Sequence, residues 1–217
     1  MKKTKSYKDF PSKGKSTVKN QLILINSSRN FKDYLSSLKN RHFGKYNKIP
    51  NYIITNEGVI HKLLQDDEYS GFFKNENINK NSIIICLENL GWLQKEPLKD
   101  YHINWIGDIY KGKVFDRKWR DYFFWEPYKE EQIVSLSSLC KELTKKFSIP
   151  KTSIGHNTKI YGIEKIKGIV TRSNFDSIFT DVTPSFDFDK FNKMLGNEEF
   201  TWRNKEIIKG IQKYAFN

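Results

Sequence analysis

The sequence of 217 residues predicts an α/β fold in which a single mixed central β-sheet is flanked by helices. Three observations predict it. Short apolar runs rich in β-branched residues have the length and composition of buried strands. Longer segments repeat apolar residues at helical spacing. Two of the apolar runs are joined by a tight turn, which indicates an antiparallel pair inside an otherwise alternating order of strands and helices.

Five segments are expected to form the sheet: residues 21–26, 51–55, 59–63, 82–87 and 168–170. The runs at 21–26 and 82–87 are continuously apolar with polar flanks, which is typical of strands buried on both faces. The runs at 51–55 and 59–63 are separated by Asn56, Glu57 and Gly58. Because glycine tolerates positive φ, this triplet predicts a hairpin turn.

Helices are expected between and after these strands. Ser27, Ser28 and Asn30 offer N-caps to a helix over residues 31–39. The clearest helix begins after Pro127, with acidic residues in its first turn, and continues at helical spacing to Pro150. Shorter helical segments are expected at 189–195 and 204–215.

The chain length is suited to one domain, expected over residues 21–217, with additions. Residues 1–20 contain seven lysines and no periodicity, which predicts a flexible basic arm. Residues 91–128 are irregular and aromatic, which predicts an insertion packed on the sheet as a flap. Residues 196–217 are expected to form a helical extension at the C-terminal end.

A formal net charge of +13 predicts attraction to polyanions, here a weak one through residues 1–20, although a solubilising tail explains the arm equally well. No apolar run is long enough to span a bilayer, and the lysine-rich start lacks the apolar core of a secretory signal, so cytoplasmic synthesis is expected. Cys86 and Cys140 lie in apolar patterns and are expected to be buried thiols.

Four segments together resemble the amidase-2 superfamily, which includes phage-type N-acetylmuramoyl-L-alanine amidases and peptidoglycan recognition proteins. They cover residues 22–28, 51–59, 81–87 and 168–188 in the order that this family shows. The resemblance implies the fold expected above, a catalytic zinc held by two histidines and an Asp or Cys, and a water that attacks the lactyl-amide bond.

The positions that correspond to the two histidine ligands do not carry histidine, and the third position retains the family's residue type only if it is Asp181. The first histidine corresponds to Asn26, the second to Thr171 or Arg172, and the third ligand to Asp181 or Thr183. Asparagine is a poor zinc donor, and an arginine places a permanent positive charge beside the metal. The resemblance therefore implies a degenerate site in which only Asp181 retains a ligand type.

The family's acid/base residues are missing as well. Pro50 stands where the phage enzymes have a tyrosine, and Phe179 or Asp181 stands where they have a lysine. A histidine of the substrate-facing loop corresponds to Lys74. Glu88 and Asp108 are alternative carboxylates, although a lone carboxylate at a strand end is more often a capping residue.

The sequence therefore predicts a non-catalytic amidase-fold protein without a catalytic residue or a metal ligand. Its former metal pocket is expected to bind a peptidoglycan fragment, a muropeptide or a protein partner through six residues: Asn26, Asn51, Lys74, Arg172, Asp181 and Thr183. Arg172 is expected either to bind a carboxylate of the ligand or to pair internally with Asp181.

Two other functions stay open at this point. An active cell-wall amidase requires zinc, whereas the preferred interpretation requires no cofactor. A structural or interaction protein of a phage particle uses the basic arm and the aromatic insertion for contacts. Release on lysis or transport in a particle is then the expected route to the cell wall.

Overall fold

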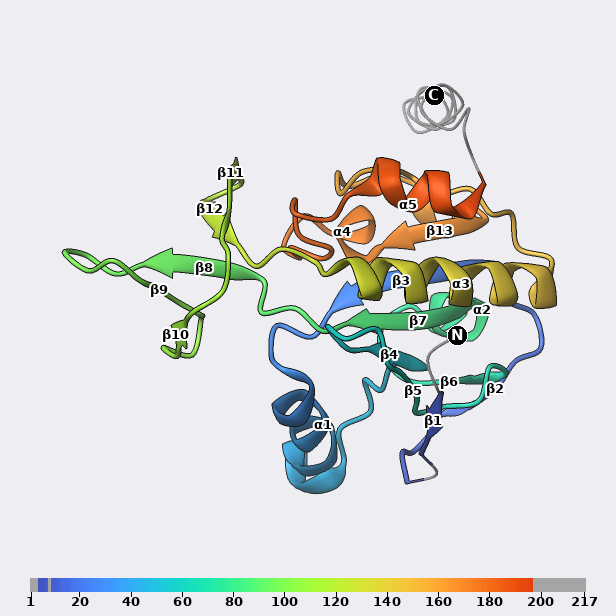
Figure 1. The fold of residues 1–217 in the computed structure, drawn as a ribbon. Coiled ribbons are helices and arrows are strands. Elements are labelled where there is room, and N and C mark those ends of the chain that lie inside the picture. Colours follow the sequence, from blue (N-terminus) through green and yellow to red (C-terminus); the bar gives the residue numbers. More distant parts are fainter. Residues whose placement is uncertain (1–3, 8, 197–217) are drawn as a thin grey trace.

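The computed structural model describes residues 4–7 and 9–196 and contains the mixed central sheet that the sequence predicts. The sheet has six strands in the order β1-β5-β4-β7-β3-β13 (Figure 1). Among the described strands of this sheet, only β4 and β5 are antiparallel neighbours; the other neighbours are parallel. The strands are β1 Lys5–Ser6, β3 Gln21–Asn26, β4 Tyr52–Ile54, β5 Ile60–Lys62, β7 Ser82–Leu87 and β13 Gly168–Thr171.

Five α-helices accompany the sheet, and the predicted ones are confirmed within the described residues. They are α1 Phe31–Asn40, α2 Glu76–Asn81, α3 Glu130–Phe147, α4 Arg172–Phe175 and α5 Phe188–Leu195. The Asn30 side chain caps α1 by accepting a hydrogen bond from the backbone of Asp33. Two 3-10 turns, η1 Arg41–Gly44 and η2 Ile163–Lys165, are the other helical elements of the described residues. The helix expected at 204–215 lies outside the described residues.

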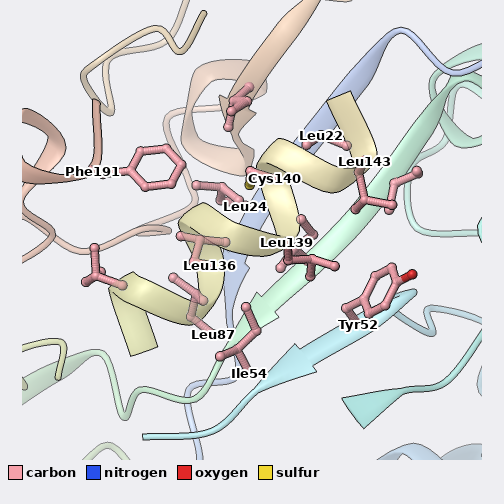
Figure 2. Packing of buried hydrophobic residues seen from close by; sticks show 14 of the residues in the cluster. Leu22, Leu24, Tyr52, Ile54, Leu87, Leu136, Leu139, Cys140, Leu143 and Phe191 are labelled. Atoms are coloured by element: carbon pink, nitrogen blue, oxygen red, sulfur yellow. The ribbon is translucent and has the colours of Figure 1, made fainter. Parts of the chain in front are cut away.

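The sheet separates two apolar cores. Successive side chains of a strand point to opposite faces, so Leu22 and Leu24 of β3 pack against α3 and α5. Ile23 and Ile25 pack on the other face with Leu38 of α1. Figure 2 shows α3 lying across β3, β7 and β4 with its apolar residues directed into the first core. Cys86 and Cys140 are buried free thiols in these cores, as predicted.

The N-terminal segment is packed on the sheet, so the prediction of a free arm is wrong for its described residues. Strand β1 adds to the edge of the sheet next to β5, and β2 Gly14–Lys15 pairs with β6 Glu68–Tyr69. Phe10 is 8% exposed and belongs to the second core. The buried ammonium of Lys19 donates to the carbonyls of Lys80 and Ser82, and burial lowers its pKa to about 8.

The aromatic insertion forms a sheet of its own instead of a flap on the central sheet. Five antiparallel strands follow the order β10-β9-β8-β12-β11 and project from the end of the molecule at which β3 and β7 finish (Figure 1). The strands are β8 Trp92–Lys95, β9 His102–Ile103, β10 Ile109–Tyr110, β11 Phe115–Trp119 and β12 Tyr122–Trp125. No described helix has the length and apolar character needed to cross a membrane.

Candidate functional site

The candidate site lies where the parallel strands β3 and β13 end side by side. Leu24 is paired with Thr171, so Asn26 and Arg172 leave the sheet at the same edge. The hydroxyl and the amide of Thr171, the N-cap of α4, both donate to the Asn174 side chain, which completes a capping box at the start of this helix. This capping box fixes the start of α4. Arg172, the first residue of the helix, is the charged residue directed toward the loop after α4, which contains Asp181.

Arg172 forms an ion pair with Asp181, which is the internal alternative considered from the sequence. Arg172 Nε contacts Asp181 Oδ2, and the two side chains are 21% and 3% exposed. Burial alone lowers the pKa of Arg172, but the adjacent Asp181 carboxylate more than offsets it and raises the pKa above the usual value. The Asp181 carbonyl also accepts from the backbone of Ser173 at 3.1 Å, so this loop is held at both its backbone and its side chain.

Tyr128 joins the remaining predicted residues of this edge. Its hydroxyl accepts a hydrogen bond from the amide of Thr183 at 3.3 Å and interacts with the Asn26 side chain. Burial raises the pKa of Tyr128, and the nearby charge of Asp181 adds to the rise. Asn26 in turn accepts from the hydroxyl of Ser28 at 3.2 Å. Asn26, Thr183 and Asp181 therefore converge around one tyrosine, with Arg172 attached through Asp181.

Asn51 does not belong to this group. It aligns with the beginning of β4, three residues before the strand end where the site lies. Its side-chain amide donates to the carbonyls of Gln65 and Glu68, and its oxygen accepts from the amide of Ile84. All three bonds hold the loop after β5 against β7, so Asn51 has a structural position.

Lys74 lines a separate groove next to the site. The groove has a volume of about 770 Å³ and is bounded by the loop before α2, the turn containing η2 and the segment after α4. Its charged lining residues are Lys48, Lys74, Lys159, Glu164 and Asp176, and its aromatic lining residues are Phe72, Phe73, Tyr161, Phe175 and Phe179. The Arg172 guanidinium lies 5.9 Å from the Phe72 ring centre and 4.3 Å from that of Phe179, which connects the ion pair to the groove.

The aromatic insertion supplies two contacts at this edge that the sequence did not predict. Trp105, in the turn between β9 and β10, donates its indole N–H to the carbonyl of Ser28 at 2.5 Å. Arg120, in the turn between β11 and β12, donates to the carbonyl of Phe179. Tyr128 is a third unpredicted residue. Its partners are distant in the sequence, so no local pattern could have indicated its place.

The residues at this edge do not fit a zinc ion. Among residues 4–7 and 9–196, no three His, Cys, Asp or Glu side chains gather as a metal-binding group. Asn26 offers a weak donor, and the permanent charge of Arg172 occupies an oxygen of Asp181 that a metal would need.

Other titratable side chains have local partners. The His61 ring is hydrogen-bonded to the hydroxyl of Tyr7, and the His156 ring accepts a hydrogen bond from the amide of Thr158.

The two carboxylates considered as alternatives are also held locally. Glu88 accepts hydrogen bonds from the amides of Phe31 and Asn56 at 2.7 and 2.9 Å, which makes it a cap of α1. Asp108 accepts from Asn104 within the turn of the insertion. These contacts support the structural interpretation of both carboxylates.

Comparison with known proteins identifies the family. The Amidase_2 family, described as N-acetylmuramoyl-L-alanine amidase, matches residues 17–168, and the chain belongs to it. This match includes Asn26 and ends before Arg172 and Asp181, so the position of the second half of the site rests on the fold. Comparison of the sequence with curated proteins found no match.

Several solved amidase structures have a similar fold. LysC from Clostridium intestinale has a TM-score of 0.55 and 12% identity, over 90% of this chain and 99% of that chain. AmiA from Staphylococcus aureus has a TM-score of 0.53 and 8% identity, over 94% and 84%. AmpDh3 from Pseudomonas aeruginosa, in complex with an anhydromuramic pentapeptide, has a TM-score of 0.52 and 14% identity, over 87% and 64%. Identities this low show the fold alone.

Proposed function

We propose that this chain is a non-catalytic member of the amidase family that binds peptidoglycan fragments through the groove beside the former metal site. One observation carries the proposal: the guanidinium of Arg172 pairs with Asp181, at positions that the resemblance assigns to the family's zinc ligands. A fixed cation there neutralises the carboxylate, but it has no open coordination position at which a water can be activated.

The groove has the chemistry that a muropeptide requires. Aromatic rings form its apolar surface, and ligand sites commonly combine such surfaces with a few polar groups. The lining carries an excess of positive charge, because it contains three lysines and only two carboxylates. They are Lys48, Lys74, Lys159, Glu164 and Asp176. This excess suits the carboxylates of a peptide stem. The anhydromuramic pentapeptide bound by the relative AmpDh3 is a ligand of this kind.

Metal content and activity separate this proposal from an active amidase, which the family match favours. The chain should be purified without chelator, measured by elemental analysis, and assayed for release of peptides from purified peptidoglycan with zinc added. We expect far less than one zinc per chain and no release. About one zinc per chain together with released peptides would support the active enzyme and refute the non-catalytic proposal.

Retention on purified peptidoglycan at low salt tests the binding half of the proposal. We expect the chain to be retained, and Lys74→Ala to weaken retention because a lysine of the groove is lost. Lys141→Ala is the matched control, since Lys141 is an exposed lysine of α3, on the other side of the sheet. Equal retention of the two variants would exclude Lys74 from the binding surface. Absence of retention of the unchanged chain would contradict peptidoglycan binding and leave a protein partner as the occupant of the groove.

We also propose that the chain reaches the cell wall on lysis or within a particle. The similar structure LysCS from Clostridium intestinale is described as an endolysine and has a TM-score of 0.55 with 12% identity. Detection of the chain in purified particles, or in the medium only after lysis, distinguishes the two routes. Its presence in the medium of intact cells would contradict both.

A further inference from the structure

A second surface, separate from the former metal site, lies at the turn that follows α1. We define the basic turn as residues 39–48. It contains Lys39, Arg41, Lys45 and Lys48, and the chain has no Asp or Glu between Asp33 and Glu57. Within the described part of the chain, none of these four cations forms an ion pair with a carboxylate. The positive charge of the turn is therefore free to attract an external anion.

The basic turn also exposes one large apolar side chain at its tip. Phe43 is 102% exposed, while the flanking Arg41, His42, Gly44 and Lys45 are exposed as well. His42, Phe43 and Gly44 adopt consecutive left-handed conformations, with φ of 55°, 54° and 78°. Such backbone is sparsely populated for residues other than glycine, so the conformation that presents Phe43 is an unusual one.

The aromatic residues of the basic turn indicate which kind of polyanion it can bind. Single-stranded nucleic acid is bound by successive free aromatic faces on which bases stack. In the basic turn, Tyr46 is not free, because the Arg41 guanidinium lies 4.9 Å from its ring centre and the His42 ring stacks on it at 5.8 Å. Only Phe43 remains available. A single apolar tip surrounded by cations fits the surface of an anionic membrane. There the apolar side chain contacts the acyl chains and the cations contact the anionic headgroups.

We propose that the basic turn docks the protein on an anionic lipid surface, with Phe43 inserted at the headgroup boundary and the cations on the lipid phosphates. The chemistry is that of phosphatidylglycerol-type headgroups. Asn47 and Lys48 line both the hollow of the basic turn and the groove described above, so docking would bring the mouth of that groove close to the membrane surface. The proposal is independent of whether the groove binds peptidoglycan.

Co-sedimentation of the full chain with lipid vesicles tests this proposal. We expect binding to vesicles of phosphatidylglycerol mixed with phosphatidylcholine, release by salt, and no binding to vesicles of phosphatidylcholine alone. Arg41→Gln combined with Lys45→Gln should weaken partitioning about 30-fold, because each cation near an anionic surface contributes about 1 kcal/mol. Phe43→Ser should weaken it about tenfold, through loss of apolar burial.

Matched variants on the insertion serve as controls. Phe123→Ser removes a 48% exposed aromatic residue, and Lys111→Gln with Lys113→Gln removes two exposed cations. We expect wild-type partitioning for both. Equal losses in the control and test variants would overturn the proposal, as would absence of binding to the anionic vesicles. Binding to single-stranded DNA or to a soluble glycerol-phosphate polymer that resists Phe43→Ser, without vesicle binding, would also overturn it.

Discussion

At the scale of single residues, the site depends on a buried charge pair. Replacing Arg172 by alanine leaves Asp181, whose side chain is 3% exposed, without its counter-charge. Breaking a buried ion pair on one side costs about 3–5 kcal/mol, so we expect Arg172→Ala to lower the free energy of unfolding by about this amount. Urea denaturation at neutral pH measures the change.

A double variant shows whether this cost comes from the isolated carboxylate. Removing both charges in Arg172→Met with Asp181→Leu should recover most of the loss, because replacing a buried pair by apolar side chains is often neutral. If Arg172→Ala costs less than about 1 kcal/mol, the pair behaves as a surface salt bridge. The site would then lack the fixed internal cation on which the non-catalytic proposal depends.

The buried carboxyl of Glu126, at the same edge of the sheet, should make the free energy of unfolding depend on pH. Burial raises the pKa of its carboxyl to about 7, with a further rise from the charge of Glu88. Its unfolded pKa is about 4.3, so between these values the folded state binds more protons than the unfolded state. Stability therefore falls as pH rises through this window, by on the order of 3 kcal/mol.

Glu126→Gln should abolish this contribution, since glutamine does not titrate. We expect the variant to lose less stability than the wild type between pH 5 and pH 8, measured by urea denaturation at both values. The interaction with the amide of Leu90 retains an acceptor in the variant. Parallel pH profiles for the two proteins would show that Glu126 is hydrated and titrates normally.

The sequence predicted part of this site and missed the rest for a physical reason. The resemblance to the amidase-2 superfamily assigns Asn26, Arg172 and Asp181 to one pocket. Asn26 and Arg172 lie together because the parallel strands β3 and β13 end side by side, and the ion pair with Arg172 brings Asp181 to them. Asn51 was assigned to the pocket, although its side chain bonds to the loop after β5. Tyr128 was missed. A side chain's partner depends on tertiary contacts, which neither periodicity nor motif position specifies.

At the scale of elements, the turn between β4 and β5 requires glycine. Gly58 has φ of +74°, and a Cβ there would collide with the backbone oxygen of Glu131 in α3. We expect Gly58→Ala to destabilise the fold by more than about 2 kcal/mol, through backbone strain and overpacking together. Thermal or urea unfolding measures it.

Gly107 is the control for the conformational part of that cost. Its φ is +91°, but no atom lies within 4 Å of an added Cβ. Gly107→Ala should therefore cost about 1 kcal/mol, from the positive φ alone. Equal costs at the two positions would mean that α3 moves to accommodate the new methyl group.

The N-terminal segment shows why an element can escape prediction. It joins the sheet through backbone pairing and packs two aromatic residues, Tyr7 and Phe10, on the second core, so its sequence has no apolar period. Phe10→Ala should cost about 3 kcal/mol, since Phe10 is 8% exposed. Phe43→Ala is the control, because Phe43 is 102% exposed and buries nothing. Similar stabilities for the two variants would indicate that the N-terminal segment is a free arm, as the sequence predicts.

At the scale of the whole molecule, the central sheet was predictable and the insertion was not. Strands buried on both faces give continuous apolar runs, and β3 and β7 were expected at their observed bounds. The insertion has strands of two to five residues, most of them exposed or only half-buried, and a run that short has no measurable alternation. Its aromatic residues pair mainly with one another, as Trp92 stacks on Tyr122 at 4.8 Å.

The insertion should therefore be separable from the groove. Trp92 and Trp125 are paired across an antiparallel ladder, so their Cα atoms are about 5 Å apart and a short glycine linker can replace residues 93–124. The groove contains no residue of this segment. We expect the shortened chain to unfold cooperatively and to be retained on peptidoglycan like the full chain, with a loss of stability from the contacts of Trp105 and Arg120. A folded variant that is no longer retained would place the binding surface on the insertion and remove the groove from the proposed function.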